Sequence, residues 1–324
     1  MKSPLLSLPG AVPAEGVDEG VAAHYGDLFR EQRALADGTG FVDLSHRGVV
    51  TVSGEDRLTW LHLLLTQHVS ELPAGEATEA LILSAHGHIE HALYLVDDGA
   101  TVWAHVEPGT EQALIAYLES MKFFYRVEVA DRTGEYAVVH LPAGSIAEAP
   151  EGVVVRETAY GRDLFLPRAD LEPYAADLGR HGPPAGILAH EALRVEQHRP
   201  RLGFETDHRT IPHELGWIGT AVHLHKGCYR GQETVARVQN LGKPPRRLVF
   251  LHLDGSEVHL PAHGTEIRLA DDGPDGRKVG FVTTSVRHHE LGPVALALLK
   301  RNVPVDARLL AGDTAAAQET VVEP

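Results

Sequence analysis

The sequence predicts an α+β protein of several domains that ends in a small antiparallel β-barrel. Three observations support this fold class. Over residues 21–142, strand-like runs and helical stripes follow the order strands, helix, strands, and not a repeated strand–helix–strand array. A smaller version of that order recurs over residues 152–242, which we expect to form a middle α+β domain. Beyond a linker at 242–245, strand and turn patterns dominate to residue 312, as is typical of a small barrel.

The first domain is expected over residues 21–142. Residues 1–20, rich in Pro, Gly, Ala and Glu without periodicity, are expected to form a flexible arm. Apolar residues at helical spacing predict three helices, over 21–35, 58–65 and 114–121. The predicted strands are 41–44, 49–52, 78–83, 89–96, 101–106, 125–129 and 136–141. Asp97-Asp98-Gly99 is a hairpin turn signal between two of them.

The middle domain follows a Pro- and Gly-rich gap at 142–152. Its predicted elements are strands at 153–157 and 163–166 and helices at 169–178 and 187–196. The barrel is expected over 246–312. Its predicted strands are 247–253, 265–269, 278–285 and 294–299, with a tight turn at 271–276. We expect residues 313–324 to be a disordered tail.

Composition limits the classes of partner. The 324 residues include 29 Lys or Arg and 45 Asp or Glu, a formal charge of −16. A surface this acidic repels phosphate backbones and anionic lipids, so we expect neither nucleic acid nor membrane as a partner. One cysteine excludes an internal disulfide and a four-cysteine metal site. With neither a signal segment nor a spanning segment expected, the sequence favours a cytoplasmic protein in a reducing compartment.

Histidine is abundant, with 21 residues, and invites a metal interpretation. The pairs at 86/88, 223/225 and 288/289 lack a further ligand at the fixed offset that makes a zinc motif specific. We therefore predict no metal site and assign these pairs structural or surface roles.

The most informative segment surrounds the only thiol. Cys228 lies between the cations Lys226 and Arg230 and between Gly227 and Gly231. A helix is predicted to begin near Gly231, so its dipole and the two cations would favour the thiolate. The alternative interpretation is that Cys228 fills a small buried space and that the glycines form an ordinary turn.

Positive charge gathers in the same region. Ten Lys or Arg and five acidic residues fall between positions 194 and 247, a local balance of +5. This indicates a site for a small anionic ligand, unless the arginines pair with the acidic surface. Glu196, held beside Arg194, would accept hydrogen bonds from a ligand edge such as that of a pterin or guanine. The pair is alternatively a plain ion pair of a helix surface. Trp217 is either a stacking platform or part of the core.

The sequence resembles a known family at these residues. Residues 226–233, Lys-Gly-Cys-Tyr-Arg-Gly-Gln-Glu, resemble the K-G-C-Y-x-G-Q-E signature of YgfZ-type folate-binding proteins. These form a branch of the aminomethyltransferase (glycine cleavage T-protein) superfamily. Residues 41–56 and 194–214 resemble two further blocks of that superfamily, and the similarity spans about residues 20–310. Gln197-His198-Arg199 departs from the usual glycine-containing step, so the loop after Glu196 is expected to differ.

The resemblance implies a ring of domains around a central pocket for tetrahydrofolate, or for a one-carbon-substituted form. Glu196 falls at the superfamily's pterin-binding carboxylate, with Arg194 holding it, and Cys228 is implied as a reactive thiol at the pocket. The other signature residues expected at the pocket are Lys226, Gly227, Tyr229, Arg230, Gly231, Gln232 and Glu233, and from its ring chemistry we also place Trp217 there. Relatives assist iron–sulfur cluster assembly or repair, so iron–sulfur enzymes are the implied clients.

One departure bears on catalysis. Aminomethyltransferases carry G-G-I-x-D-D with a catalytic aspartate, where this chain has His91 or Ala92, depending on register. Loss of an acid/base partner costs a factor of about 10²–10⁴ in rate. Glu90 is one residue away and would face the other side of a strand. We therefore favour a tetrahydrofolate-binding accessory protein. The alternatives are an aminomethyltransferase that uses Glu90 or a histidine, and an interaction scaffold with a vestigial pocket.

Overall fold

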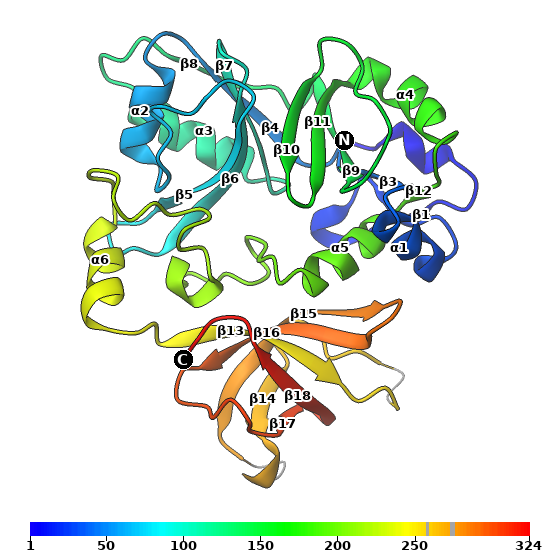
Figure 1. Ribbon diagram of the computed structural model, residues 1–324, viewed down its shortest axis with the longest axis vertical. Helices are drawn as coiled ribbons and strands as arrows, with labels where there is room; N and C mark the ends of the chain where they lie inside the picture. Colours follow the sequence, from blue (N-terminus) through cyan, green and yellow to red (C-terminus); the bar gives the residue numbers. More distant parts are fainter. Residues whose placement is uncertain (257–258, 273–275) are drawn as a thin grey trace. The chain divides into compact units, whose positions relative to one another are not determined.

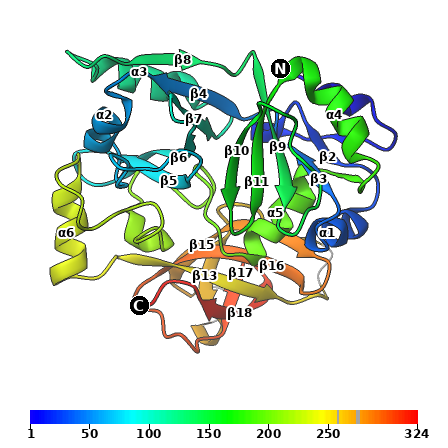
Figure 2. The ribbon, with the colours of Figure 1, turned by 45° about the horizontal axis from the view of Figure 1, so that its top comes forward.

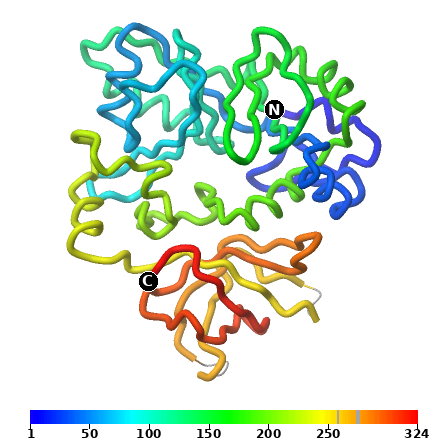
Figure 3. The backbone as a smooth tube through the Cα atoms, in the orientation of Figure 1, coloured from blue at the N-terminus to red at the C-terminus, as the bar shows by residue number. Residues whose placement is uncertain are grey.

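The computed structural model describes residues 1–256, 259–272 and 276–324. It divides into two compact units, and Figure 3 traces the chain through both. The first comprises residues 1–82 and 91–190, and the second comprises residues 83–90 and 191–324. The turn expected at 271–276 includes residues 273–275, which lie outside the described residues. No helix within the described residues has the length and apolar character needed to cross a membrane.

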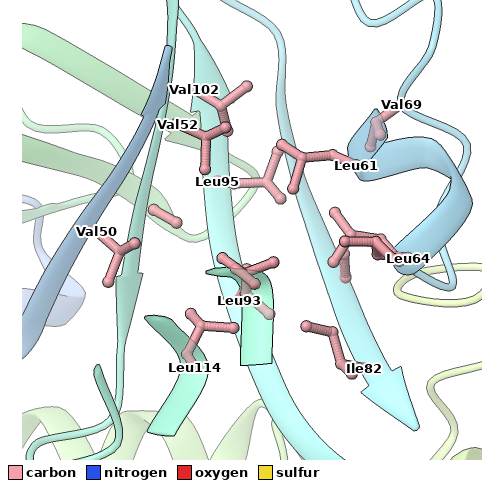
Figure 4. Packing of buried hydrophobic residues seen from close by; sticks show 14 of the residues in the cluster. Val50, Val52, Leu61, Leu64, Val69, Ile82, Leu93, Leu95, Val102 and Leu114 are labelled. Carbon is pink, nitrogen blue, oxygen red and sulfur yellow. The ribbon is translucent and has the colours of Figure 1, made fainter. Parts of the chain in front are cut away.

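A five-stranded sheet with two helices forms one part of the first unit. The strand order is β5-β6-β7-β4-β8. The bounds are β4 Gly48–Ser53, α2 Arg57–Leu64, β5 Ala77–Leu83, β6 Ile89–Asp97, β7 Thr101–Val106, α3 Glu111–Ser120 and β8 Glu128–Asp131. In Figure 4, Leu61 and Leu64 lie across from Leu95 and Ile82. Alternate residues of the strands thus enter one apolar cluster, as the period of two predicts.

A second five-stranded sheet of this unit has the order β10-β11-β9-β3-β12. Figure 2 shows β9, β10 and β11 side by side. The bounds are β3 Phe41–Asp43, β9 Tyr136–Pro142, β10 Val154–Thr158, β11 Gly161–Pro167, α4 Leu171–Leu178 and β12 Pro184–Ala185. The β12 strand pairs with β3 in parallel. The first unit also contains α1, Leu28–Ala36. This helix begins after the capping residue Asp27, later than the predicted start at residue 21.

The flexible arm expected over residues 1–20 is wrong. These residues include the 3₁₀ helix η1, Pro4–Ser7, and the strand β1, Val12–Pro13, which pairs with β2, Ala22–His24. Leu5 is 1% exposed and packs into the core beside α4. The Ser3 hydroxyl donates to Asp43 of β3. The buried Leu5, the Ser3 hydrogen bond and the β1–β2 pairing together hold a segment whose composition carries no periodic signal.

The second unit contains a closed barrel, drawn from yellow to red in Figure 1. Its strand order is β13-β16-β15-β14-β17-β18. The bounds are β13 Arg246–Leu253, β14 Glu266–Leu269, β15 Lys278–His288, β16 Gly292–Lys300, β17 Leu309–Ala311 and β18 Thr314–Thr320. All its pairings are antiparallel, as predicted.

The disordered tail expected over 313–324 and the barrel limit at 312 are wrong. The strand β18 lies in that segment and pairs with both β13 and β17, so it closes the barrel. Its buried residues are the small Thr314 and Ala316. Small side chains give a weak hydrophobic pattern, which explains why the sequence alone did not reveal this strand.

Candidate functional site

Residues 226–231, here called the signature loop, precede α6, Gln232–Leu241. This is the helix that the sequence predicts to begin near Gly231. Gly231 caps this helix with a left-handed φ of 84°. A Cβ at Gly231 would lie 2.6 Å from the carbonyl oxygen of Ser84 and 2.9 Å from Cα of Gly87. At Gly87 a Cβ would lie 2.7 Å from Cβ of Thr234. Glycine is therefore required at both contact points, and the loop lies directly against residues 83–90.

A salt bridge adds to that contact. The Arg230 Nη1 donates to Oε2 of Glu90 at 2.9 Å, and both side chains are partly exposed. Glu90 is exposed while Ile89 is 6% exposed, so the two point to opposite sides as expected. Residues 226–233 and residues 83–90 are thus neighbours within the second unit.

The only thiol is accessible. Cys228 is exposed, so the alternative interpretation of a buried filler is wrong. Lys226, by contrast, is 2% exposed, and its Nζ lies 5.1 Å from the ring centroid of Tyr229. Burial lowers the pKa of Lys226 to about 8 and raises the pKa of Tyr229 to about 12. Lys226 therefore remains mostly cationic at pH 7, two residues from the thiol.

Glu196 lies beside a buried histidine of the barrel. It ends α5, Ile187–Glu196, is 41% exposed, and its Oε2 lies 3.3 Å from Nε2 of His288. The Nδ1 of His288 accepts the backbone N–H groups of Glu290 and Leu291, so the ring proton is on Nε2. Burial lowers the pKa of His288, which keeps this ring neutral at pH 7. That Glu196 binds a pterin stays a prediction.

Arg194 does not hold Glu196, contrary to expectation. It is 4% exposed, bonds Glu191 through Nε and Nη2, and donates from Nη1 to Glu205 at 2.9 Å. Its Nη2 also donates to Thr284 at 3.0 Å. Burial alone would lower the pKa of Arg194, but Glu191 and Glu205 outweigh burial and raise it. Arg194 therefore joins α5 to the barrel strand β15.

Two further arginines of the region, Arg246 and Arg201, also have acidic partners. Arg246 donates to Asp207 at 2.6 Å and to Glu214 at 2.8 Å. Arg201 lies 3.4 Å from Glu191. The interpretation that these arginines pair with surrounding acids therefore describes the structure. Trp217 is 4% exposed, which places it in the core and not on a free surface.

The remaining predicted residues lie at the start of α6. Gln232 N–H donates to the Tyr229 carbonyl at 3.2 Å, and Glu233 occupies the first helical turn. Gly227 has a left-handed φ of 40° with open space around its missing Cβ. The contacts of Glu196 come from β15, whereas those of the signature loop come from residues 83–90. That Cys228 and Glu196 open onto one cavity stays a prediction.

The sequence reasoning missed three partners: Glu191, Glu205 and His288. Glu205 is fully buried and accepts from the hydroxyls of Thr283 and Thr284. Glu191 precedes Arg194 by three residues on the helix, the spacing at which side chains meet. That spacing is a signal in the sequence from which the Glu191–Arg194 pair could have been predicted. The contacts of Glu205 and His288 join distant parts of the chain and have no such signal in the sequence.

Comparison with known proteins gives consistent results. Residues 22–148 match the model of the GCVT N-terminal domain. An aminomethyltransferase of Herpetosiphon aurantiacus is 27% identical, covering 92% of this chain and 90% of that protein. A putative chloroplastic transferase of Arabidopsis thaliana is 26% identical over 82% of this chain and 66% of its own length.

A solved structure of glycine cleavage system aminomethyltransferase T from Bartonella henselae superposes with a TM-score of 0.82 at 19% identity. The superposition covers 99% of this chain and 95% of the Bartonella henselae chain. The predicted α+β fold of the glycine cleavage T-protein type, with its C-terminal barrel, is confirmed. Together these similarities support the aminomethyltransferase superfamily and do not distinguish its YgfZ-type branch.

Proposed function

We propose that this chain is a cytoplasmic tetrahydrofolate-binding accessory protein that supports iron–sulfur cluster assembly or repair. One observation carries the proposal. The only thiol, Cys228, is exposed in a loop that Gly231 fixes against residues 83–90. That segment adjoins the position where the resemblance places the catalytic aspartate of aminomethyltransferases, which is here His91 or Ala92. The chain thus presents a thiol without that carboxylate.

Folate binding rests on Glu196. A pterin edge presents adjacent N–H donors, and a carboxylate accepts two such bonds. His288 Nε2 lies 3.3 Å from Oε2 of Glu196, which is 41% exposed, and each carboxylate oxygen has two lone pairs, so both oxygens can accept a bond from the ligand. Arg194, Arg201 and Arg246 are compensated by acids, so we assign the selection of the ligand to the carboxylate.

The thiol is proposed to act with a partner. One cysteine cannot hold a cluster alone, so a client iron–sulfur enzyme supplies the remaining ligands or the second thiol. Lys226 lies two residues before Cys228, so the loop that exposes the thiol also carries a buried cation. A reducing compartment keeps such a lone thiol available.

Calorimetric titration with tetrahydrofolate tests the site. Glu196→Gln keeps the shape and removes the charge, and we expect affinity to fall about tenfold to a hundredfold, as for hydrogen bonds to a charged group. Glu319→Gln, an exposed acid of the barrel, is the matched control and is expected to bind normally. Cys228→Ser is expected to keep folate affinity and to lose alkylation by iodoacetamide. Unchanged affinity in Glu196→Gln would contradict the site.

A folate-dependent aminomethyltransferase is the second candidate, favoured by the names of the relatives. Glu90 would be its base, although Arg230 already bonds its Oε2. Turnover with an aminomethyl donor and tetrahydrofolate that disappears in Glu90→Gln would support this candidate. Stable capture of a partner by a chain without folate affinity would instead support the scaffold alternative.

A further inference from the structure

We propose that a small pocket of the first unit binds an alkylated ammonium group. The cavity measures about 160 Å³. Its lining includes three aromatic residues, Trp103 of β7, Tyr136 of β9 and Phe165 of β11, and two acids, Glu151 and Asp170. None of the lining residues belongs to the second unit, which carries Glu196 and Cys228.

The aromatic walls are held in place by the two sheets. The rings of Trp103 and Tyr136 meet edge to face, with centroids 4.8 Å apart and planes at 73°. The Phe165 ring lies 5.7 Å from Trp103. The indole N–H of Trp103 donates to Oδ2 of Asp98 at 2.8 Å, so its polar edge is satisfied and its orientation fixed. Trp103 and Tyr136 are half-buried, whereas Phe165 is 1% exposed and packs behind Trp103, so the first two rings are the preorganised aromatic surface that a cation can reach.

The two acids give the pocket an uncompensated negative charge. Glu151 and Asp170 are exposed, and within the described part of the chain neither carboxylate has a hydrogen bond or an ion pair. Asp170 precedes α4 at the capping position, yet its side chain makes no capping hydrogen bond. The lining contains no Lys, Arg or His. The charge excludes anions, and together with the rings it selects a cation.

The cation is organic and small. Metal ions need several oxygen, nitrogen or sulfur ligands, which the aromatic walls do not provide. Alkyl groups on nitrogen weaken hydration and pack against apolar side chains such as Val153. The cavity is well below the roughly 300–1,000 Å³ of sites for drug-sized ligands, so it accommodates a single head group. Free choline and a trimethylated lysine side chain share this chemistry.

Three probes separate the possibilities in calorimetric titrations of the full chain. Choline carries the charge, 3,3-dimethylbutan-1-ol is its neutral carbon isostere, and a trimethyl-lysine peptide tests a protein source. We expect saturable binding of choline or the peptide and none of the isostere. Trp103→Ala and Asp170→Asn are each expected to weaken binding about tenfold or more. The controls Phe124→Ala, a fully exposed aromatic, and Asp177→Asn, an exposed acid, should bind normally.

The decisive outcomes are distinct. Equal binding of choline and the isostere, or binding of no cationic probe, overturns the proposal. Tighter binding of the peptide than of choline assigns a methylated protein as the source, and the reverse assigns a small molecule. If Trp103→Ala does not fold by circular dichroism, the double variant Glu151→Gln/Asp170→Asn decides, because both acids are exposed. Unchanged affinity in that double variant also overturns the proposal.

Discussion

Acidification is expected to destabilise the first unit through a buried histidine of β7. His105 is 3% exposed, and its Nε2 lies 3.1 Å from Oδ2 of Asp163. Burial lowers the pKa of His105 to about 4, and the charges of Arg47 and Arg156 act in the same direction, while Asp163 opposes them. In the unfolded chain a histidine titrates near about 6.5.

The sign follows from the proton balance. Because the folded pKa is the lower one, the unfolded chain binds more protons between about pH 6.5 and 4. The stability is present above about pH 6.5 and is lost as the pH falls through this range. From pH 7 to pH 5, the difference between the two pKa values gives a loss of about 2 kcal/mol. Hydrogen bonds from His105 and His140 outweigh burial and hold the pKa of Asp163 well below its usual range, so its own contribution is lost at lower pH.

Urea unfolding followed by circular dichroism at pH 7 and pH 5 measures this loss. The variant His105→Gln removes the titrating group. Between pH 7 and pH 5, we therefore expect the free energy of unfolding to fall less in this variant than in the wild type, by about 2 kcal/mol. His181→Gln, an exposed histidine of the same unit, is the matched control and should behave as the wild type. An equal loss in His105→Gln and the wild type would refute the reasoning.

Two further substitutions test the packing around the candidate site, both by urea unfolding. Gly231→Ala and Gly219→Ala both place a side chain at a left-handed φ, a cost of about 1–2 kcal/mol. Only the Cβ of Gly231→Ala would also lie 2.6 Å from a carbonyl oxygen, so this variant should lose more unfolding free energy than Gly219→Ala. Equal losses in the two variants would contradict the close packing at Gly231. Arg194→Met leaves Glu191 and Glu205 buried without their cation and should cost about 3–5 kcal/mol. Arg237→Met, at an exposed position, should be nearly neutral, and a similarly small loss in Arg194→Met would show that Arg194 is not structural.

The periodic spacing of apolar residues predicted helices and strands well where an element buries one apolar face. The helix expected at 187–196 has those bounds, and the strand expected at 78–83 differs by one residue. Prediction failed where order comes from distant contacts. Residues 1–20 are held by Leu5 and Ser3, and β18 exists because β13 and β17 leave a barrel edge to close. Neither edge pairing nor a single buried anchor leaves a periodic trace.

The error at Arg194 has a geometric cause that the sequence did contain. Residues two apart on a helix point in nearly opposite directions, so Arg194 and Glu196 could not share a face, whereas Glu191 is three residues away and does. Pairing with Glu191 and Glu205 removes Arg194 from the surface charge, as Arg246 is removed by Asp207 and Glu214. The excess of cations counted along the chain therefore overstates the free positive charge here. If the proposed folate site is correct, a change in salt concentration should affect folate affinity far less than the loss of the Glu196 carboxylate.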